Sequence, residues 1–269
     1  GGHRTLDGTQ TWMRRSLSLF CLVAACLIAL FPVISGLMET HRQQEAVSTF
    51  RQEASTVSAD RARELEQEAR AWNEARRHGQ PLSGDYDQIL DITQTGIMAT
   101  LSIPKISVNL PVYHGTGEEV LSAGAGHVEF SDLPLGEPGY HSVLSAHRGM
   151  PSARLFTRLD ELKAGDLFFV DTPAQSLAYE VTDIQVVEPE DTGVLDPVPG
   201  QDLVSLVTCT PYGINTHRLV VTGRRTTVDT TAEDAQAPAL PSARELAFLL
   251  APTGFGAAAF LLYRRKETT

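Results

Sequence analysis

The sequence predicts a mainly β protein: a closed β-barrel of seven or eight strands with short helices, preceded by an N-terminal helical region and flanked by two transmembrane helices. Three observations lead to this prediction. Short apolar, β-branched runs follow one another between residues 96 and 226, separated by proline and glycine. Residues 39–78 contain neither glycine nor proline and are rich in Glu, Gln, Arg and Ala. Two long apolar runs lie near the ends of the 269-residue chain.

The first apolar run, Ser16 to Leu37, has 22 residues and no charged side chain. As a helix it is long enough to cross about 30 Å of hydrocarbon, so we predict a transmembrane helix over residues 16–38. A cleaved signal peptide is the alternative, because two arginines precede the run and small residues occur near its end. The length of the run favours an uncleaved anchor.

The second apolar run, residues 246–263, contains Pro252 and is followed directly by three basic residues. It predicts a second transmembrane helix. Basic residues outside both runs place the two ends of the chain, residues 1–15 and 264–269, in the cytoplasm by the positive-inside rule. We therefore expect a protein of the cell membrane whose region between the two runs is extracytoplasmic.

The chain between the two predicted spans is strongly acidic. It carries 16 basic and 31 acidic side chains, a net charge near −15, against −11 for the whole chain. Such a charge argues against binding to nucleic acid. The expected partners are membrane lipid, through the two spans, and proteins or wall components; we expect no cofactor and no metal.

Residues 39–95 predict a helical stalk and a connector. The spacing of apolar residues indicates one long or two short helices. These helices either lift the following domain off the membrane or pack against the surface of that domain through Phe50, Leu65 and Trp72. Glycine and proline in residues 79–84 end the helix, and Tyr86 to Leu90 predict one more short helix.

The barrel is predicted over residues 96–226. Helical turns are expected at Glu118 to Ala123 and at Ala153 to Leu162, and residues 227–245 have the composition of a flexible spacer. The predicted strands are Ile97–Ile103, Val108–Tyr113, Val143–Ala146, Leu167–Asp171, Leu177–Val187, Leu203–Thr208 and Leu219–Arg225.

Cys209 is the only cysteine outside the first apolar run. A single unpaired thiol in an exported domain is unusual unless the thiol reacts. The residue ends a predicted strand, and Arg218 follows nine positions later, after a turn, on the return strand. A guanidinium there supplies the permanent positive charge that favours a thiolate. The alternative is a small buried thiol with no chemical role.

The residues around Cys209 resemble the active-site segment of the sortases, whose signature is Thr-Leu-x-Thr-Cys followed by an arginine. Here the signature runs from Ser205, which stands where the family usually has Thr, and the continuation to Leu219 is similar to the pilus-assembling, class C branch. Further likeness extends over the segments Ile103–Ile106, Leu110–Thr116 and Leu155–Thr157. The resemblance implies a sortase-type catalytic barrel.

Pilus-type sortases usually carry a lid with an Asp-Pro-Phe or Asp-Pro-Trp triplet before the barrel. This sequence has no such triplet in that region. Asp85 and Tyr86 offer an acid beside an aromatic residue, but we expect an exposed turn there, and a packing role for Trp72. A conventional lid is therefore not expected from the sequence.

A cysteine nucleophile needs a partner that exchanges protons near neutral pH, and histidine is the side chain suited to this. His147 follows a predicted strand in the context Ala-His-Arg-Gly, similar to the Ala-His-x-Gly context of the catalytic histidine in sortases. Structural hydrogen bonds are expected instead for four other histidines of the barrel. They are His114, His127, His141 and His217.

The resemblance implies a membrane-anchored cysteine transpeptidase acting on a Leu-Pro-x-Thr-Gly-like sorting signal. In that scheme Cys209 forms a thioester with the threonine carbonyl, His147 protonates the departing glycine amine, and Arg218 donates hydrogen bonds to the oxyanion or the substrate backbone. Partners would be pilin or other surface proteins carrying the signal, and a pilin lysine would resolve the thioester.

Three alternatives stay open. The first is a housekeeping-type sortase that attaches surface proteins to peptidoglycan precursor. The second is a non-catalytic, membrane-tethered binding barrel. The third is an exported thiol oxidoreductase, which the lack of a Cys-x-x-Cys motif in the sequence disfavours.

Overall fold

The computed structural model describes residues 6–82, 84–150, 153–227 and 256. The chain divides into two compact units after Leu37, and helix α1 (Leu6–Thr56) runs through this boundary. In the first unit, apolar side chains of α1 such as Ile28 and Phe31 are exposed. Within the described residues, no helix has the length and hydropathy that crossing a bilayer requires. The first predicted span stays a prediction, and the second lies almost wholly outside the described residues.

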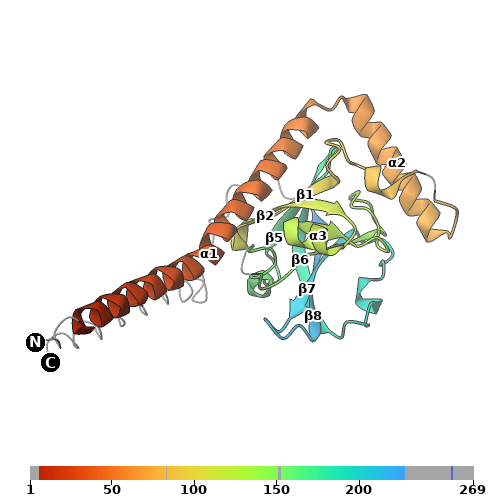
Figure 1. Cartoon of the computed structure of the whole chain (residues 1–269). Coiled ribbons are helices and arrows are strands. Elements are labelled where there is room, and N and C mark those ends of the chain that lie inside the picture. Colours follow the sequence, from red (N-terminus) through yellow and green to blue (C-terminus); the bar gives the residue numbers. More distant parts are fainter. Residues whose placement is uncertain (1–5, 83, 151–152, 228–255, 257–269) are drawn as a thin grey trace, which may run out of the picture. The chain divides into compact units, whose positions relative to one another are not determined.

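A closed, eight-stranded β-barrel forms the centre of the second unit (Figure 1). Its strands neighbour one another in the order β1-β2-β3-β4-β7-β8-β6-β5, and β1 pairs with β5 to close the ring. The strand bounds are β1 Ile97–Ile103, β2 Val108–His114, β3 Ala125–His127, β4 His141–Ser145, β5 Leu167–Asp171, β6 Ser176–Val187, β7 Leu203–Thr210 and β8 His217–Thr226.

The structure confirms the predicted mainly β, closed barrel and adds one strand to the seven predicted runs. That strand, β3, has three residues, Ala-Gly-His, and so contains no apolar run that a sequence pattern would reveal. The shorter helical elements are α3 Glu118–Ala123, η1 Tyr86–Gln88, η2 Pro104–Ile106, η3 Leu159–Glu161 and η4 Gly193–Leu195.

The helical turns predicted over residues 153–162 shrink to the single turn η3. Leu155 has a φ of 39°, in the left-handed region that interrupts a right-handed helix. Both Leu155 and Phe156 are buried in the apolar core. The left-handed residue therefore confines the helical structure of this segment to η3.

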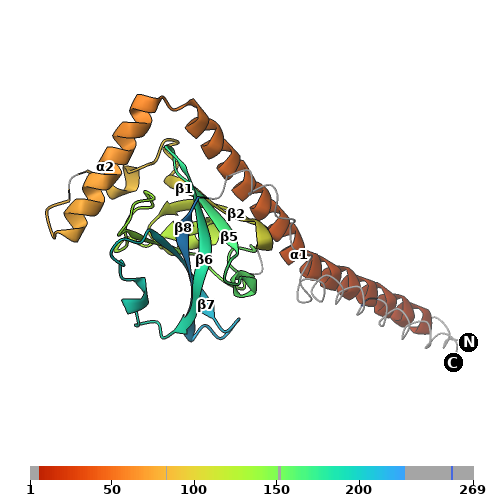
Figure 2. The same ribbon diagram turned by 180° about the vertical axis from the view of Figure 1, so that it is seen from behind.

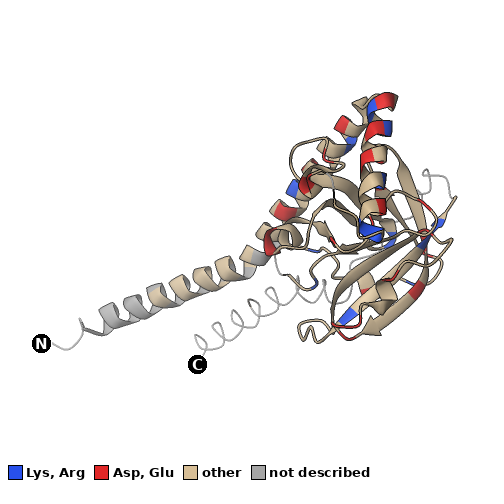
Figure 3. Ribbon diagram, turned by 90° about the vertical axis from the view of Figure 1, so that its right-hand side faces the viewer, with Lys and Arg blue, Asp and Glu red and all other residues tan. Residues whose placement is uncertain are grey.

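The part of α1 after Leu37 and helix α2 (Ala59–Arg77) lie against the barrel (Figures 1 and 2), the arrangement expected if these helices pack on the surface of the domain. Phe50, Leu65 and Trp72 are all buried. Figure 3 shows acidic and basic residues interspersed along α2 and the later part of α1, and ion pairs such as Arg63–Asp60 form between residues three apart.

A buried carboxylate fastens the end of α2 to the start of β4. Asp132 has no exposed side-chain surface and accepts two hydrogen bonds from Arg77, at 3.0 and 2.8 Å, and another from Arg76. Burial alone would raise the pKa of Asp132, but the hydrogen bonds from Arg77, from the amide of His141 and from Arg76 hold that pKa below its ordinary value. The charged form is therefore the stable one.

The connector between α2 and β1 packs through Tyr86, which corrects the prediction of an exposed turn at that residue. Its hydroxyl lies 2.7 Å from Nδ1 of His127, and its ring stacks on Trp72 with centroids 5.7 Å apart. His114 meets the same ring edge to face at 5.0 Å. Trp72 thus has the predicted packing role, and both histidines make structural contacts as expected.

We expect His127 to make the fold sensitive to acid. Burial lowers the pKa of this imidazole from 6.5 to about 4. As the pH falls below 6.5, the unfolded chain binds a proton that the folded protein does not. The stabilisation from neutral His127 is therefore lost between about pH 6.5 and 4, and about 2 kcal/mol of it is gone by pH 5.

Urea unfolding of wild type and His127→Gln at pH 8 and pH 5 tests this. Wild type should lose about 2 kcal/mol more than the variant over that interval. The comparison with the variant is needed because Asp202 also titrates in this range. Burial raises the pKa of Asp202 to about 6, so its contribution to stability increases as the pH falls from 6 to 3.8, opposite to that of His127. Equal losses in both proteins would contradict the prediction.

Candidate active site

The ends of three neighbouring strands, β4, β7 and β8, meet at one end of the barrel. Strands β7 and β8 are antiparallel, and Cys209 stands directly opposite Arg218 in their register. Strands β4 and β7 are parallel, with Ser145 opposite Val207. Continuing that register by two residues places His147 level with Cys209. The barrel therefore brings all three predicted site residues to one row across adjacent strands.

Cys209 lies one residue before the end of β7 and is partly exposed. The strand before it is buried, as its apolar and β-branched run predicts. After it, the chain turns through Pro211, whose carbonyl accepts hydrogen bonds from the amides of Ile214 and Asn215, both at 3.0 Å. Asn215 has a φ of 61°, a left-handed conformation that asparagine tolerates better than most residues. This turn reverses the chain into β8.

Arg218 is held by the same turn. Its Nη1 donates to the carbonyl of His217 at 3.1 Å and, more weakly, to that of Asn215 at 3.4 Å. Since directly opposite residues of an antiparallel pair share a face of the sheet, the guanidinium and the thiol lie on the same side. Among the described contacts, Nε and Nη2 make no hydrogen bond, so these donors remain available to a substrate.

His147 follows β4 by two residues, and its carbonyl accepts a hydrogen bond from the amide of Phe156 at 3.1 Å. Its side chain is 28% exposed, and Nε2 lies 3.3 Å from a carboxylate oxygen of Glu118 at the start of α3. Glu118 is 82% exposed, so this contact contributes little to stability. Sequence reasoning missed Glu118, because 29 residues separate it from the histidine.

Two structural features explain why glycine occupies position 149 of the Ala-His-Arg-Gly motif. Its φ is 83°, which glycine adopts without strain. A Cβ there would lie 3.0 Å from the ring of Tyr212 on the turn after Cys209. The glycine therefore lets the loop that carries His147 pack closely against the turn that joins β7 to β8.

Ser205, the position that departs from the sortase signature, is fully buried on β7. Its hydroxyl lies 2.7 Å from Nε2 of His141 and 2.7 Å from the hydroxyl of Thr222. Burial lowers the pKa of His141, so the neutral ring accepts a hydrogen bond from the Ser205 hydroxyl at Nε2 while Nδ1 donates to the carbonyl of Asp196. His141 thus has the structural role predicted for it, and Ser205 supplies the hydroxyl this network needs.

His217, the last of the four barrel histidines, pairs with Glu188 at 3.1 Å on the surface. In the part of the chain that the structure describes, no three His, Cys, Asp or Glu side chains come together as metal ligands would.

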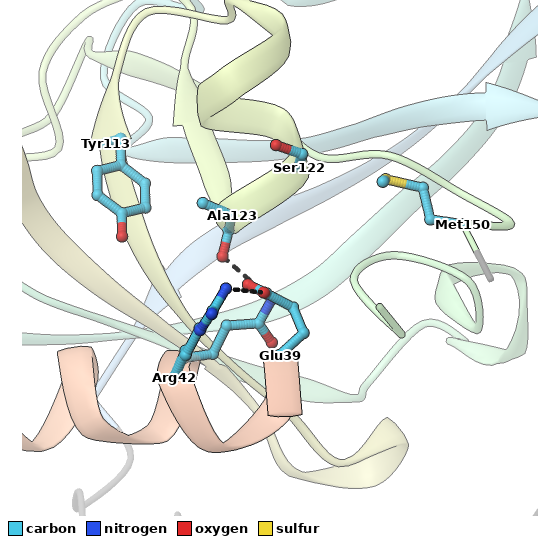
Figure 4. Close-up of a pocket in the computed structure, with 7 residues that line it drawn as sticks. Glu39, Arg42, Tyr113, Ser122, Ala123 and Met150 are labelled. Atoms are coloured by element: carbon cyan, nitrogen blue, oxygen red, sulfur yellow. Dashed lines mark hydrogen bonds and ion pairs between the residues drawn. The ribbon is translucent and has the colours of Figure 1, made fainter. Parts of the chain in front are cut away.

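A cavity of about 380 Å³ lies beside the site and is drawn in Figure 4. Glu39 and Arg42 of α1 form one wall, and Met150, three residues after His147, contributes another. The remaining lining residues are Gln43, Tyr113, Ser122 and Ala123. Cys209, His147 and Arg218 are not among them, so this cavity borders the loop that carries His147 rather than enclosing the thiol.

A family model described as the Sortase domain matches residues 101–226. Among solved structures, sortase C1 from Streptococcus agalactiae is 40% identical with a TM-score of 0.64, and the match covers 69% of this chain and 100% of that one. The chain belongs to the sortase family. A sortase C from Clostridium perfringens, solved with the C-terminal cell wall sorting motif, is 35% identical with a TM-score of 0.62, over 68% of this chain and 99% of that one.

The curated sortase A of Streptococcus agalactiae serotype III is 32% identical over 118 residues, which are 42% of this chain and 47% of that protein. The match thus spans about half the length of that relative. The class C structures match more of the chain than the Sortase domain does, so the likeness to them extends beyond the barrel. This favours a sortase most similar to class C.

Proposed function

We propose that this sortase is a cysteine transpeptidase that cleaves a Leu-Pro-x-Thr-Gly-like sorting signal and joins the product to an amine of a pilin lysine. The observation that carries the proposal is that Cys209 and Arg218 stand opposite each other on β7 and β8, with His147 two residues beyond the end of the neighbouring strand β4. A base or acid, a thiol and a guanidinium at one partly exposed barrel end are the parts that acyl transfer through a thioester needs.

In the first step the Cys209 thiolate attacks the threonine carbonyl of the signal. The oxyanion that forms accepts hydrogen bonds from Arg218, and His147 gives its proton to the glycine amine as the peptide bond breaks. The result is a thioester on Cys209 and a free glycine-bearing fragment. In the second step the incoming amine attacks the thioester and passes a proton to His147. The new amide forms, and the Cys209 thiolate is released.

The substrate class rests on the family. The related Clostridium perfringens enzyme was solved with a cell wall sorting motif, which supports a sorting signal as the acyl donor here. We further propose that residues 16–38 and 246–263 anchor the chain in the cell membrane, with the barrel outside the cytoplasm. The uncharged run of 22 residues and the basic residues that flank the two runs support this.

The acceptor distinguishes the two candidate functions. Likeness to class C structures and two predicted anchors favour pilin polymerisation. The curated relative is a sortase A, which keeps attachment of surface proteins to peptidoglycan precursor as the second candidate. Both use the same chemistry and differ in the amine that resolves the thioester.

Deletion of the gene in the source organism should remove high-molecular-weight pilin polymers from cell-wall extracts, while most other sorted proteins stay attached to the wall. Immunoblots of wall and medium fractions with a pilin antibody measure this, and re-expression of the wild-type gene is the control. An intact pilin ladder together with release of many different surface proteins into the medium would reject the pilus assignment in favour of wall anchoring.

A further inference from the structure

Arg148, directly after His147, is a cation in an unusual place. Its side chain is only 3% exposed, although arginine is rarely buried without a partner. Nη2 lies 2.5 Å from a carboxylate oxygen of Asp160 on η3. Nη1 donates to the hydroxyl of Thr210 at 3.0 Å, and Thr210 directly follows Cys209. The guanidinium therefore joins the residue after the base to the residue after the nucleophile.

This bond lies where the backbone ladder between β4 and β7 has stopped. The last paired residues are Ser145 and Val207, followed by a hydrogen bond from the amide of Ala146 to the carbonyl of Val207 at 3.2 Å. Beyond that point side chains hold the strands together: the hydroxyl of Thr208 donates to the carbonyl of Ala146 at 2.7 Å, and Arg148 bonds Thr210. Arg148 thus links the two strands at the level of the catalytic pair.

The arrangement is costly, which argues that it serves more than packing. A buried guanidinium loses its hydration, and an apolar side chain of similar volume often stabilises a fold as well or better. Nε of Arg148 is also buried and makes no hydrogen bond within the described residues. A buried donor without a partner lowers stability, and such groups are frequent at functional sites.

We propose that Arg148 is a positioning residue that sets the separation of His147 and Cys209, with Asp160 fixing its guanidinium. The inference rests on the proposed roles of Cys209 and His147. Asp160 and Thr210 come from segments 50 residues apart, and a planar fork reaches both at once. The single ammonium of a lysine does not reproduce this geometry, so a charge-conserving change should loosen the pair.

The structure offers a matched control. Arg158 is similarly buried, with 8% of its side chain exposed, and it pairs with Glu161 of η3 through two hydrogen bonds of 2.9 and 2.6 Å. This pair joins two residues three positions apart in the chain, whereas Arg148 joins the segment after β4 to the end of β7. Arg158→Lys therefore repeats the chemical change of Arg148→Lys in the same part of the fold. A purely structural role predicts the same behaviour for both variants.

The experiment measures thioester formation with a sorting-signal peptide, using full-length protein at a temperature where circular dichroism shows every variant folded. Arg148→Lys should lower kcat about 10-fold to 100-fold with a change of less than about threefold in KM, whereas Arg158→Lys should keep the wild-type kcat. The pH dependence of Cys209 alkylation by iodoacetamide should also shift in Arg148→Lys and not in Arg158→Lys. Equal kcat and alkylation profiles in the two variants would overturn the inference.

Thr210 gives a second test that keeps the guanidinium in place and decides the question if Arg148→Lys does not fold. Thr210→Val removes the hydroxyl acceptor and keeps the β-branched shape, and should lower kcat about threefold to tenfold. Thr210→Ser retains the hydroxyl and should restore most of the rate. Wild-type activity in Thr210→Val would refute the positioning role of Arg148 but leave the proposed function standing. Thioester formation by a protein lacking Cys209 would refute the proposed function itself.

Discussion

Replacing Cys209 with alanine is expected to abolish thioester formation and peptide transfer while leaving the fold intact. The thiol is the proposed nucleophile, and removing the nucleophile of a catalytic unit costs at least about 10⁴-fold in rate. Cys209 is partly exposed at the barrel end and lies outside the buried apolar core, so its loss leaves no cavity there. Mass spectrometry after incubation with a sorting-signal peptide should show the acyl adduct on wild type and not on the variant.

Cys21→Ala is the matched control, because it removes a different exposed thiol, which lies on α1 and outside the barrel. It should keep wild-type activity and the adduct. Thermal unfolding should give the same midpoint for Cys209→Ala and wild type. A Cys209→Ala protein that still joined a sorting peptide to an amine would show that the barrel does not work through this thiol, and a folded wild type that binds the peptide without reacting would favour the binding-barrel alternative.

Replacing Arg218 with lysine should reduce the rate of thioester formation about 10²-fold or more. Lysine keeps the positive charge but loses the planar fork, and the loss of one preorganised oxyanion donor costs about this much. Arg218 stands directly opposite Cys209, and Nη1 is held by two carbonyls of the turn. Single-turnover kinetics with the same peptide measure the effect on the chemical step.

Arg224→Lys is the control for this substitution. Arg224 lies on the same strand, is exposed, and stands opposite Leu203 at the other end of β7. Arg224→Lys should retain wild-type rates, because Arg224 shares only its positive charge and its strand with Arg218 and lies far from Cys209 along β8. Nearly full activity in Arg218→Lys would mean that Arg218 acts as a surface charge and that another group stabilises the oxyanion.

The strands around the thiol could be predicted because the signals for them are local. The run from Leu203 to Thr208 is β-branched and apolar, a proline and a glycine follow, and the return strand begins within nine residues of Cys209. A hairpin of this kind fixes its own register, so the pairing of Cys209 with Arg218 was already implied. The helical turns predicted over residues 153–162 were reduced to η3, because Leu155 adopts a left-handed conformation that interrupts a right-handed helix.

The position of His147 needed the closed barrel. Strands β4 and β7 are parallel and separated by 62 residues along the chain, so no local signal sets their register. The same holds for Arg148, whose burial depends on Asp160 and Thr210, and for Glu118 beside His147. Buried polar groups find partners through the whole fold, since each must replace the water it has lost.

The sequence by itself determined the β-barrel and the pairing of Cys209 with Arg218, because short-range patterns of apolar residues, glycine and proline specify strands and turns. Only the tertiary structure decided that β3 completes the barrel, that α2 is fastened through Asp132, and that Arg148 links the segment after β4 to the end of β7. These features depend on contacts between segments far apart in the chain, and closing the barrel is what brings those segments together.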